Sequence, residues 1–126
     1  MAEVLSGRER PPMREILSRI REACRERGLD PPARATVYRL LDSLPGPSYR
    51  VGDLPAPVRE ALYNLVPDSV VPGRQVAFYC VNYGRLAAVC FAAGLPWLAI
   101  RQALRMRGHR RRSRGLLEAV ARVRGI

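Results

Sequence analysis

The sequence contains no lysine: all 22 of its basic residues are arginine. It also has only one histidine and eleven acidic residues among 126 positions. The missing lysine excludes a phosphate-binding loop of the G-x-x-x-x-G-K-[ST] type. A single histidine without a recognisable carboxylate pair lacks the residues that general acid–base catalysis usually needs. The sequence therefore predicts a protein that is not an enzyme.

Cysteine and long apolar runs are scarce as well. The three cysteines are odd in number and widely spaced, which argues against a disulfide scaffold or a zinc site. We expect reduced, buried thiols, no metal ion and no cofactor. The longest uncharged apolar run, 86–100, has about 15 residues, whereas a membrane span needs about 20. No signal-type segment stands at the N-terminus, so we expect a cytoplasmic location and no membrane partner.

The charge is distributed unevenly along the chain, whose formal net charge is +11. Residues 1–68 contain eleven arginines and ten acidic residues, and residues 69–126 contain eleven arginines and only Glu118. The second half therefore carries almost all of the excess charge, which predicts a polyanionic partner. Arginine suits such a partner because its guanidinium group makes bidentate contacts with phosphate and guanine.

Hydrophobic periodicity predicts a mainly α protein with at most minor β structure. Helices are expected over the segments 12–27, 33–44, 55–65, 85–93, 96–107 and 113–124, with a minimal strand at 48–51. Segment 75–83 fits a strand or a helix by spacing alone. Pro72 before it and Gly84 after it favour a helix.

Turn residues and the change in charge divide the chain into two small helical units. We expect a flexible arm at 1–11, an N-terminal helix-turn-helix unit at 12–66, a linker at 67–73 and a basic helix-turn-helix unit at 74–126. The proposed linker is rich in Pro, Asp, Ser and Gly and coincides with the charge boundary.

In the second unit, Gly94 separates two short helices. A tight turn of this kind sets two helices at a steep angle, so that the second can enter a major groove. Arginine and glutamine at outward positions pair with guanine and adenine edges. The sequence therefore predicts base-reading roles for Arg101, Gln102 and Arg105.

In the first unit, residues 33–41 read Ala-Arg-Ala-Thr-Val-Tyr-Arg-Leu-Leu. This segment resembles the recognition helix of the helix-turn-helix domains in resolvases, invertases and transposases, whose motif reads Ser-Arg-x-Thr-Val-Tyr-Arg. Ala33 stands where that family usually has serine, the turn before it is longer, and no recombinase-like catalytic domain accompanies it. The resemblance implies that the DNA-facing residues are Arg34, Thr36, Tyr38 and Arg39.

The arginine-rich segment after residue 106 predicts contacts with DNA phosphates. The residues expected to make them are Arg107, Arg110, Arg111, Arg112 and Arg114. We expect His109, alone in this segment, to have no catalytic or metal role, and Tyr79 and Tyr83 to be core residues with surface hydroxyl groups.

Together these features predict a small bacterial transcriptional regulator that binds double-stranded DNA sequence-specifically, through one or both helix-turn-helix units. In size and layout the chain also resembles, more loosely, small repressors and the DNA-binding antitoxins encoded beside nucleotidyltransferase-like toxins. That likeness implies autoregulation and a co-encoded toxin partner. A homodimer is expected because operators are commonly palindromic. Two alternatives stay open: a basic adaptor that binds RNA or an acidic protein, and a small basic ribonuclease toxin.

Overall fold

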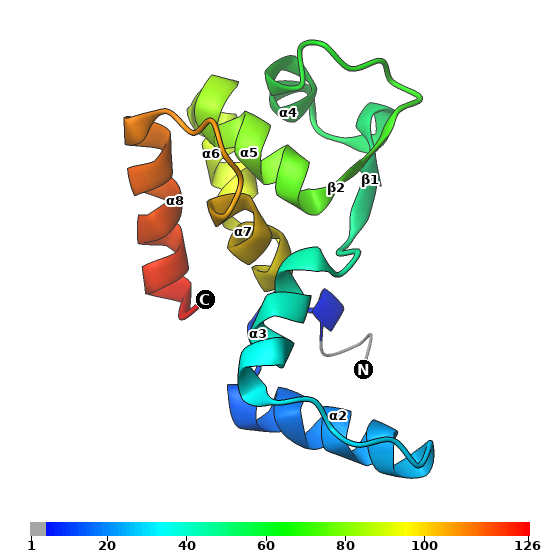
Figure 1. The fold of residues 1–126 in the computed structure, drawn as a ribbon. Helices are drawn as coiled ribbons and strands as arrows, with labels where there is room; N and C mark the ends of the chain where they lie inside the picture. Colours follow the sequence, from blue (N-terminus) through cyan, green and yellow to red (C-terminus); the bar gives the residue numbers. More distant parts are fainter. Residues whose placement is uncertain (1–4) are drawn as a thin grey trace.

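The computed structural model describes residues 5–126, which form seven α-helices and one two-stranded antiparallel sheet (Figure 1). The elements are, in chain order, α2 Met13–Glu26, α3 Arg34–Ser43, β1 Ser48–Arg50, the 3₁₀ turn η1 Val51–Asp53, α4 Ala56–Ala61, β2 Val70–Pro72, α5 Gly73–Tyr83, α6 Leu86–Ala93, α7 Trp97–Leu104 and α8 Arg111–Arg124. The predicted fold class, mainly α with minor β structure, is confirmed.

Helix α2 ends where its sequence predicts. Gly28 adopts a left-handed conformation with φ of 67°. The N–H of Leu29 donates to the carbonyl of Cys24, and the N–H of Gly28 donates to that of Arg25. This pair of bonds is the Schellman arrangement, which satisfies carbonyl groups left free at a helix end and requires a residue that tolerates positive φ.

Helix α5 lies at the centre of the larger part of the molecule and packs against α4, α6, α7 and α8. Its buried residues Val76, Ala77, Cys80 and Val81 recur at helical spacing. The ambiguous segment 75–83 is therefore helical, as its flanking proline and glycine predict. Burial also raises the pKa of the Cys80 thiol to about 12, whereas Cys90 is exposed, so the expectation of three buried cysteines is wrong.

The predicted linker 67–73 is part of the main core. Its residues 70–72 form β2, which pairs with β1 in the register Tyr49 to Val71. Buried side chains from before and after this segment, including Val58 and Val76, belong to the same hydrophobic cluster. The division at 67–73 is thus wrong in this structure, because apolar groups on both sides of the charge boundary bury one another.

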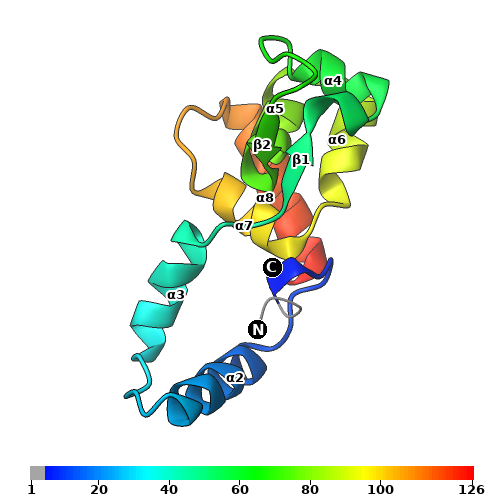
Figure 2. The ribbon, with the colours of Figure 1, turned by 90° about the vertical axis from the view of Figure 1, so that its right-hand side faces the viewer.

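The chain divides more clearly after α3. Helices α2 and α3 form a lobe that extends from the larger body formed by the remaining elements (Figures 1 and 2). A second hydrophobic cluster joins the lobe to that body. Its buried residues are Met13, Ile16, Val37 and Leu41 of the lobe and Trp97 and Leu98 of α7.

Helices α6 and α7 have helix-turn-helix geometry. Their axes differ by 115° across the break at Gly94, Leu95 and Pro96, which lies within the range of 90–120° for such motifs. Within residues 5–126, no single helix has both the length and the apolar character to cross a membrane, and this bent pair passes that test only when its two helices are taken together.

We expect Gly84→Ala to destabilise the fold. A Cβ at Gly84 would lie 2.5 Å from both the Cβ of Ala88 and the carbonyl oxygen of Cys80, and such overpacking costs about 1–3 kcal/mol. Gly115→Ala is the matched control, because a Cβ at Gly115 would have no atom within 4 Å and alanine favours a helix by about 0.5–1 kcal/mol. Urea denaturation measures both, and equal stability of the two variants would contradict the close packing at Gly84.

Candidate nucleic-acid interface

Helix α7 is enclosed by its neighbours and cannot enter a DNA groove in this fold. It packs against α3, α5 and α8, and six of its eight residues, Trp97 to Ile100 with Gln102 and Ala103, are buried. A recognition helix must present a continuous side-chain surface to the base edges. The prediction that α7 reads bases is therefore corrected. The α6–α7 pair has helix-turn-helix geometry, but its second helix is part of the core.

Gln102 has a structural role instead of the predicted base contact. Its side chain is buried, with only 3% of the residue exposed. The Nε2 group donates to the carbonyl of Leu41 at 2.9 Å and to that of Leu44 at 2.8 Å. Carbonyls at the last turn of a helix have no partner within the helix, so Gln102 satisfies the end of α3 and fixes it against α7.

Arg101 and Arg105 lie on the side of α7 that meets α3. Both form ion pairs with Asp42, at 3.4 Å from Arg101 and 3.1 Å from Arg105. The guanidinium carbon of Arg101 also lies 5.5 Å from the centre of the Tyr38 ring, within the range of a cation–π contact. The guanidinium carbon of Arg34 lies 5.8 Å from the centre of the same ring, and Arg34 Nη2 donates to the Tyr38 hydroxyl group at 3.4 Å.

These contacts join residues from both predicted DNA-binding units into one continuous strip. We call Arg34, Tyr38, Arg101, Asp42 and Arg105 the α3–α7 strip. The hydrogen bond from Arg34 lowers the pKa of Tyr38 below its ordinary value, and the charges of Arg34, Arg10 and Arg101 act in the same direction. A local potential that favours an anionic phenolate also favours other anions, such as phosphate oxygens.

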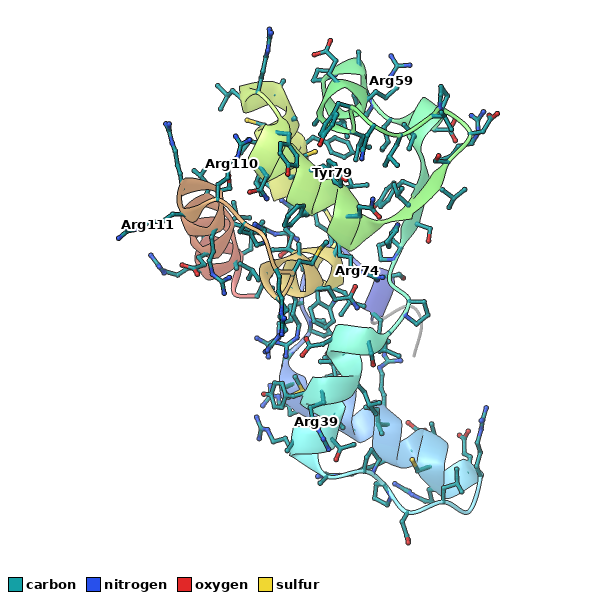
Figure 3. All side chains as sticks on the ribbon, turned by 45° about the horizontal axis from the view of Figure 1, so that its top comes forward. Arg39, Arg59, Arg74, Tyr79, Arg110 and Arg111 are labelled. Carbon is teal, nitrogen blue, oxygen red and sulfur yellow. The ribbon has the colours of Figure 1, made fainter. Side chains whose placement is uncertain are left out.

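Helix α3 presents polar groups next to this strip. Arg34 and Arg39 are exposed and Thr36 is partly exposed, while Val37 and Leu41 are buried in the second cluster. Figure 3 shows Arg39 on the outside of α3. Of the two predicted reading helices, α3 is thus the one whose surface is accessible to a partner.

The predicted phosphate contacts lie in the loop before α8 and in the first turn of α8, residues 107–114, which we call the arginine segment. Arg107, Arg110, Arg111 and Arg112 are exposed, and within residues 5–126 none of them forms an ion pair, whereas Arg114 pairs with Glu118 at 3.1 Å. Figure 2 places the loop before α8, drawn in orange, and α3 at the same edge of the molecule. The backbone that carries Arg107 and Arg110 therefore lies on the same side of the molecule as α3.

Arginines at the start of α8 oppose the helix dipole. Helix α8 begins at Arg111, with Arg110 as its N-cap and no acidic residue in its first turn. The positive end of a helix dipole disfavours cations by about 0.3–1 kcal/mol each. An anion at this position would relieve that repulsion. Ser113, in the first turn of α8, is buried.

Two polar side chains hold this arginine segment against the body. His109 Nε2 donates to the carbonyl of Ala103 at 2.7 Å, and His109 Nδ1 accepts from Asn82 Nδ2 at 3.0 Å. Asn82 Oδ1 in turn accepts from the backbone N–H of Arg110 at 2.8 Å. Sequence reasoning did not single out Asn82; an asparagine within the apolar helix α5 was the available signal.

The structure also gathers three tyrosines that the sequence did not connect. Tyr63, Tyr79 and Tyr83 contact one another at the surface, and Tyr63 and Tyr83 are 66% and 43% exposed. The expectation that Tyr79 and Tyr83 belong to the core is wrong for Tyr83 and holds only in part for Tyr79, which is partly exposed.

The chain matches no protein-family model, no curated protein and no solved structure. The resemblance of residues 33–41 to resolvase-type recognition helices, the antitoxin comparison, the homodimer and the toxin partner therefore stay predictions. The geometry of the α3–α7 strip and of the arginine segment is the basis for the function proposed below.

We expect Gln102→Met to destabilise the protein by about 1–3 kcal/mol, because a buried carbonyl of Leu41 and a partly buried carbonyl of Leu44 would lose their donor. Gln75→Met is the matched control: Gln75 is only partly buried and its side chain makes no hydrogen bond within the described part of the chain. Urea denaturation followed by circular dichroism measures both changes. Equal midpoints for the two variants would show that Gln102 does not hold α3.

Proposed function

We propose that this protein binds double-stranded DNA, with α3 in the major groove and the arginines of the loop before α8 and of the first turn of α8 on the phosphate backbone. The observation that carries the proposal is that the accessible helix α3 and the loop before α8 lie at one edge of the molecule (Figure 2), and that Arg107 and Arg110 of this loop are exposed without an ion pair in the described residues 5–126. A protein that reads duplex DNA needs both kinds of group on one face, because phosphate contacts fix the register in which base contacts are made.

The proposed roles follow from exposure and pairing. Arg39, Arg34 and Thr36 are accessible on α3 and approach base edges, with arginine favouring guanine. The residues that contact phosphate are Arg105, Arg107, Arg110, Arg111 and Arg112, with Arg114 at the margin. Arg101 has a different role, because its side chain is only 13% exposed and pairs with Asp42: it positions α3 and Tyr38.

Sequence-specific duplex binding by a chain of this size fits a small bacterial transcriptional regulator, and we propose that role. It accounts for the near-neutral first half and the strongly basic second half. The salt titration below distinguishes this role from binding to RNA.

Binding to duplex DNA should depend steeply on salt. If about six phosphates are contacted, the logarithm of the affinity should fall with the logarithm of the salt concentration at a slope near −5, because counterions are released from the DNA. The measurement is fluorescence anisotropy with a duplex selected from a random-sequence pool, at several KCl concentrations. A slope near zero, or tighter binding to the same sequence as double-stranded RNA, would contradict the proposal.

Two sets of substitutions should separate backbone contacts from base contacts. Replacing Arg110, Arg111 and Arg112 together with alanine should weaken all duplexes alike and reduce the salt slope by about 3. Arg39→Ala should instead cost about 1–3 kcal/mol on the selected sequence and little on unrelated DNA.

The charge-matched control replaces Arg14, Arg21 and Arg25 of α2 with alanine. These three arginines are exposed and outside both the α3–α7 strip and the arginine segment, so the salt slope should change by less than about 1. If this control weakened duplex binding as much as the triple change at residues 110–112, net charge alone would explain the binding.

A further inference from the structure

Three tyrosines, two from helix α5 and one from the turn after α4, form a surface cluster, which we call the tyrosine platform: Tyr63, Tyr79 and Tyr83. Tyr79 and Tyr83 are four residues apart on α5 and therefore lie on one face of that helix, and Tyr63 follows α4. The ring centres are 6.1 Å apart for Tyr63 and Tyr79, 5.4 Å for Tyr63 and Tyr83, and 5.4 Å for Tyr79 and Tyr83. Each ring thus contacts both of the others.

Two of the three platform tyrosines, Tyr79 and Tyr83, lie on α5, most of whose residues are buried. Helix α5 is buried in the main core through Val76, Ala77 and Cys80. Phe78 supports Tyr79 at 6.0 Å between ring centres and contacts the His109 ring at 4.6 Å. The backbone that carries Tyr79 and Tyr83 is therefore held in place before any partner binds, which lowers the entropy cost of binding.

An arginine closes one side of the platform. The guanidinium carbon of Arg110 lies 5.1 Å from the centre of the Tyr83 ring. Its backbone N–H donates to Asn82 Oδ1, so the position of Arg110 beside Tyr83 is fixed by a buried residue. Figure 3 shows Tyr79 on the visible surface of α5, with Arg59, Arg74 and Arg110 around it in that view.

The chemistry of these groups selects an unpaired nucleobase as the ligand. Exposed tyrosine rings bind either flat aromatic groups or cations. A cationic ligand would be repelled by Arg110, whereas a base stacks on a ring and places its phosphate near a guanidinium group. Bases inside a duplex are already stacked on their neighbours, so only an unpaired base can use the platform.

We infer that the tyrosine platform binds an unpaired base of single-stranded nucleic acid, with Arg110 contacting the adjoining phosphate. This site is separate from the α3 surface and goes beyond duplex binding. Arg110 is the one residue that belongs both to the platform and to the proposed phosphate contacts of the duplex site. A nucleic acid with a duplex and an adjacent single strand could therefore occupy both.

The test compares Tyr63→Leu with Tyr63→Phe. Tyr63 is the most exposed of the three tyrosines, so both variants should fold, and only phenylalanine keeps the aromatic ring. Fluorescence anisotropy with a labelled twelve-nucleotide oligothymidine, a matching oligouridine and a duplex measures affinity. Tyr63→Leu should weaken single-strand binding about 5- to 100-fold, Tyr63→Phe should change it less than about 2-fold, and neither should affect the duplex.

The two single strands distinguish DNA from RNA as the source of the base, and the duplex separates this inference from the proposed function. If the unmodified protein bound the single strands but not the duplex, only the proposed function would be overturned. No single-strand binding, or equal affinities for the unmodified protein and Tyr63→Leu, would overturn the platform. An equal loss in both Tyr63 variants would also overturn it, because the hydroxyl group and not the ring would then be responsible.

Photocrosslinking with an oligonucleotide that contains 5-iodouracil locates the base. Cleavage after arginine gives the peptides 60–74, with Tyr63, and 75–85, with Tyr79 and Tyr83. Mass spectrometry should find the crosslink on one of these two peptides. A crosslink confined to the peptide 35–39, which contains Tyr38, would place the base on α3 and overturn the assignment.

Discussion

The attachment of α3 to α7 is the constraint on which the rest of the structure depends. Helix α7 contributes to both hydrophobic clusters: Ile100 and Ala103 to the main core, Trp97 and Leu98 to the cluster that holds the α2–α3 lobe. Hydrogen bonds from Gln102 to the end of α3 give this apolar contact a defined geometry. A short helix buried on both sides thereby fixes the direction in which α3 projects from the body.

The arginines of this protein divide into structural and accessible groups. Arg124 donates to the carbonyls of Ala93 and Leu95, and burial followed by the nearby charge of Arg8 lowers its pKa. Arg101 pairs with Asp42 within the fold. Such residues hold the turn between α6 and α7 and the end of α3, so net charge overstates the number of guanidinium groups that a polyanion can reach. The longest uninterrupted run of exposed arginines, residues 110–112, lies at the start of α8.

Helix-turn-helix geometry is therefore not sufficient to identify a reading helix. The α6–α7 pair has the steep angle and the glycine turn of such a motif, yet its second helix is enclosed by three neighbours. The α2–α3 pair has a longer connection and leaves α3 accessible. Exposure depends on how many apolar faces a helix carries: α7 has apolar residues on most of its circumference, and α3 has a single apolar stripe.

Local features were predictable from the sequence because they depend on neighbouring residues. Helical periodicity, the glycine that ends α2 and the short strand at residue 48 all belong to this group, as does the uneven charge. Tertiary packing alone decided that the two halves share one core, that Gln102 satisfies α3 instead of facing a partner, and that Tyr63 meets the tyrosines of α5. These outcomes require contacts between residues far apart in the chain, and periodicity shows which face of a helix is apolar without showing what covers it.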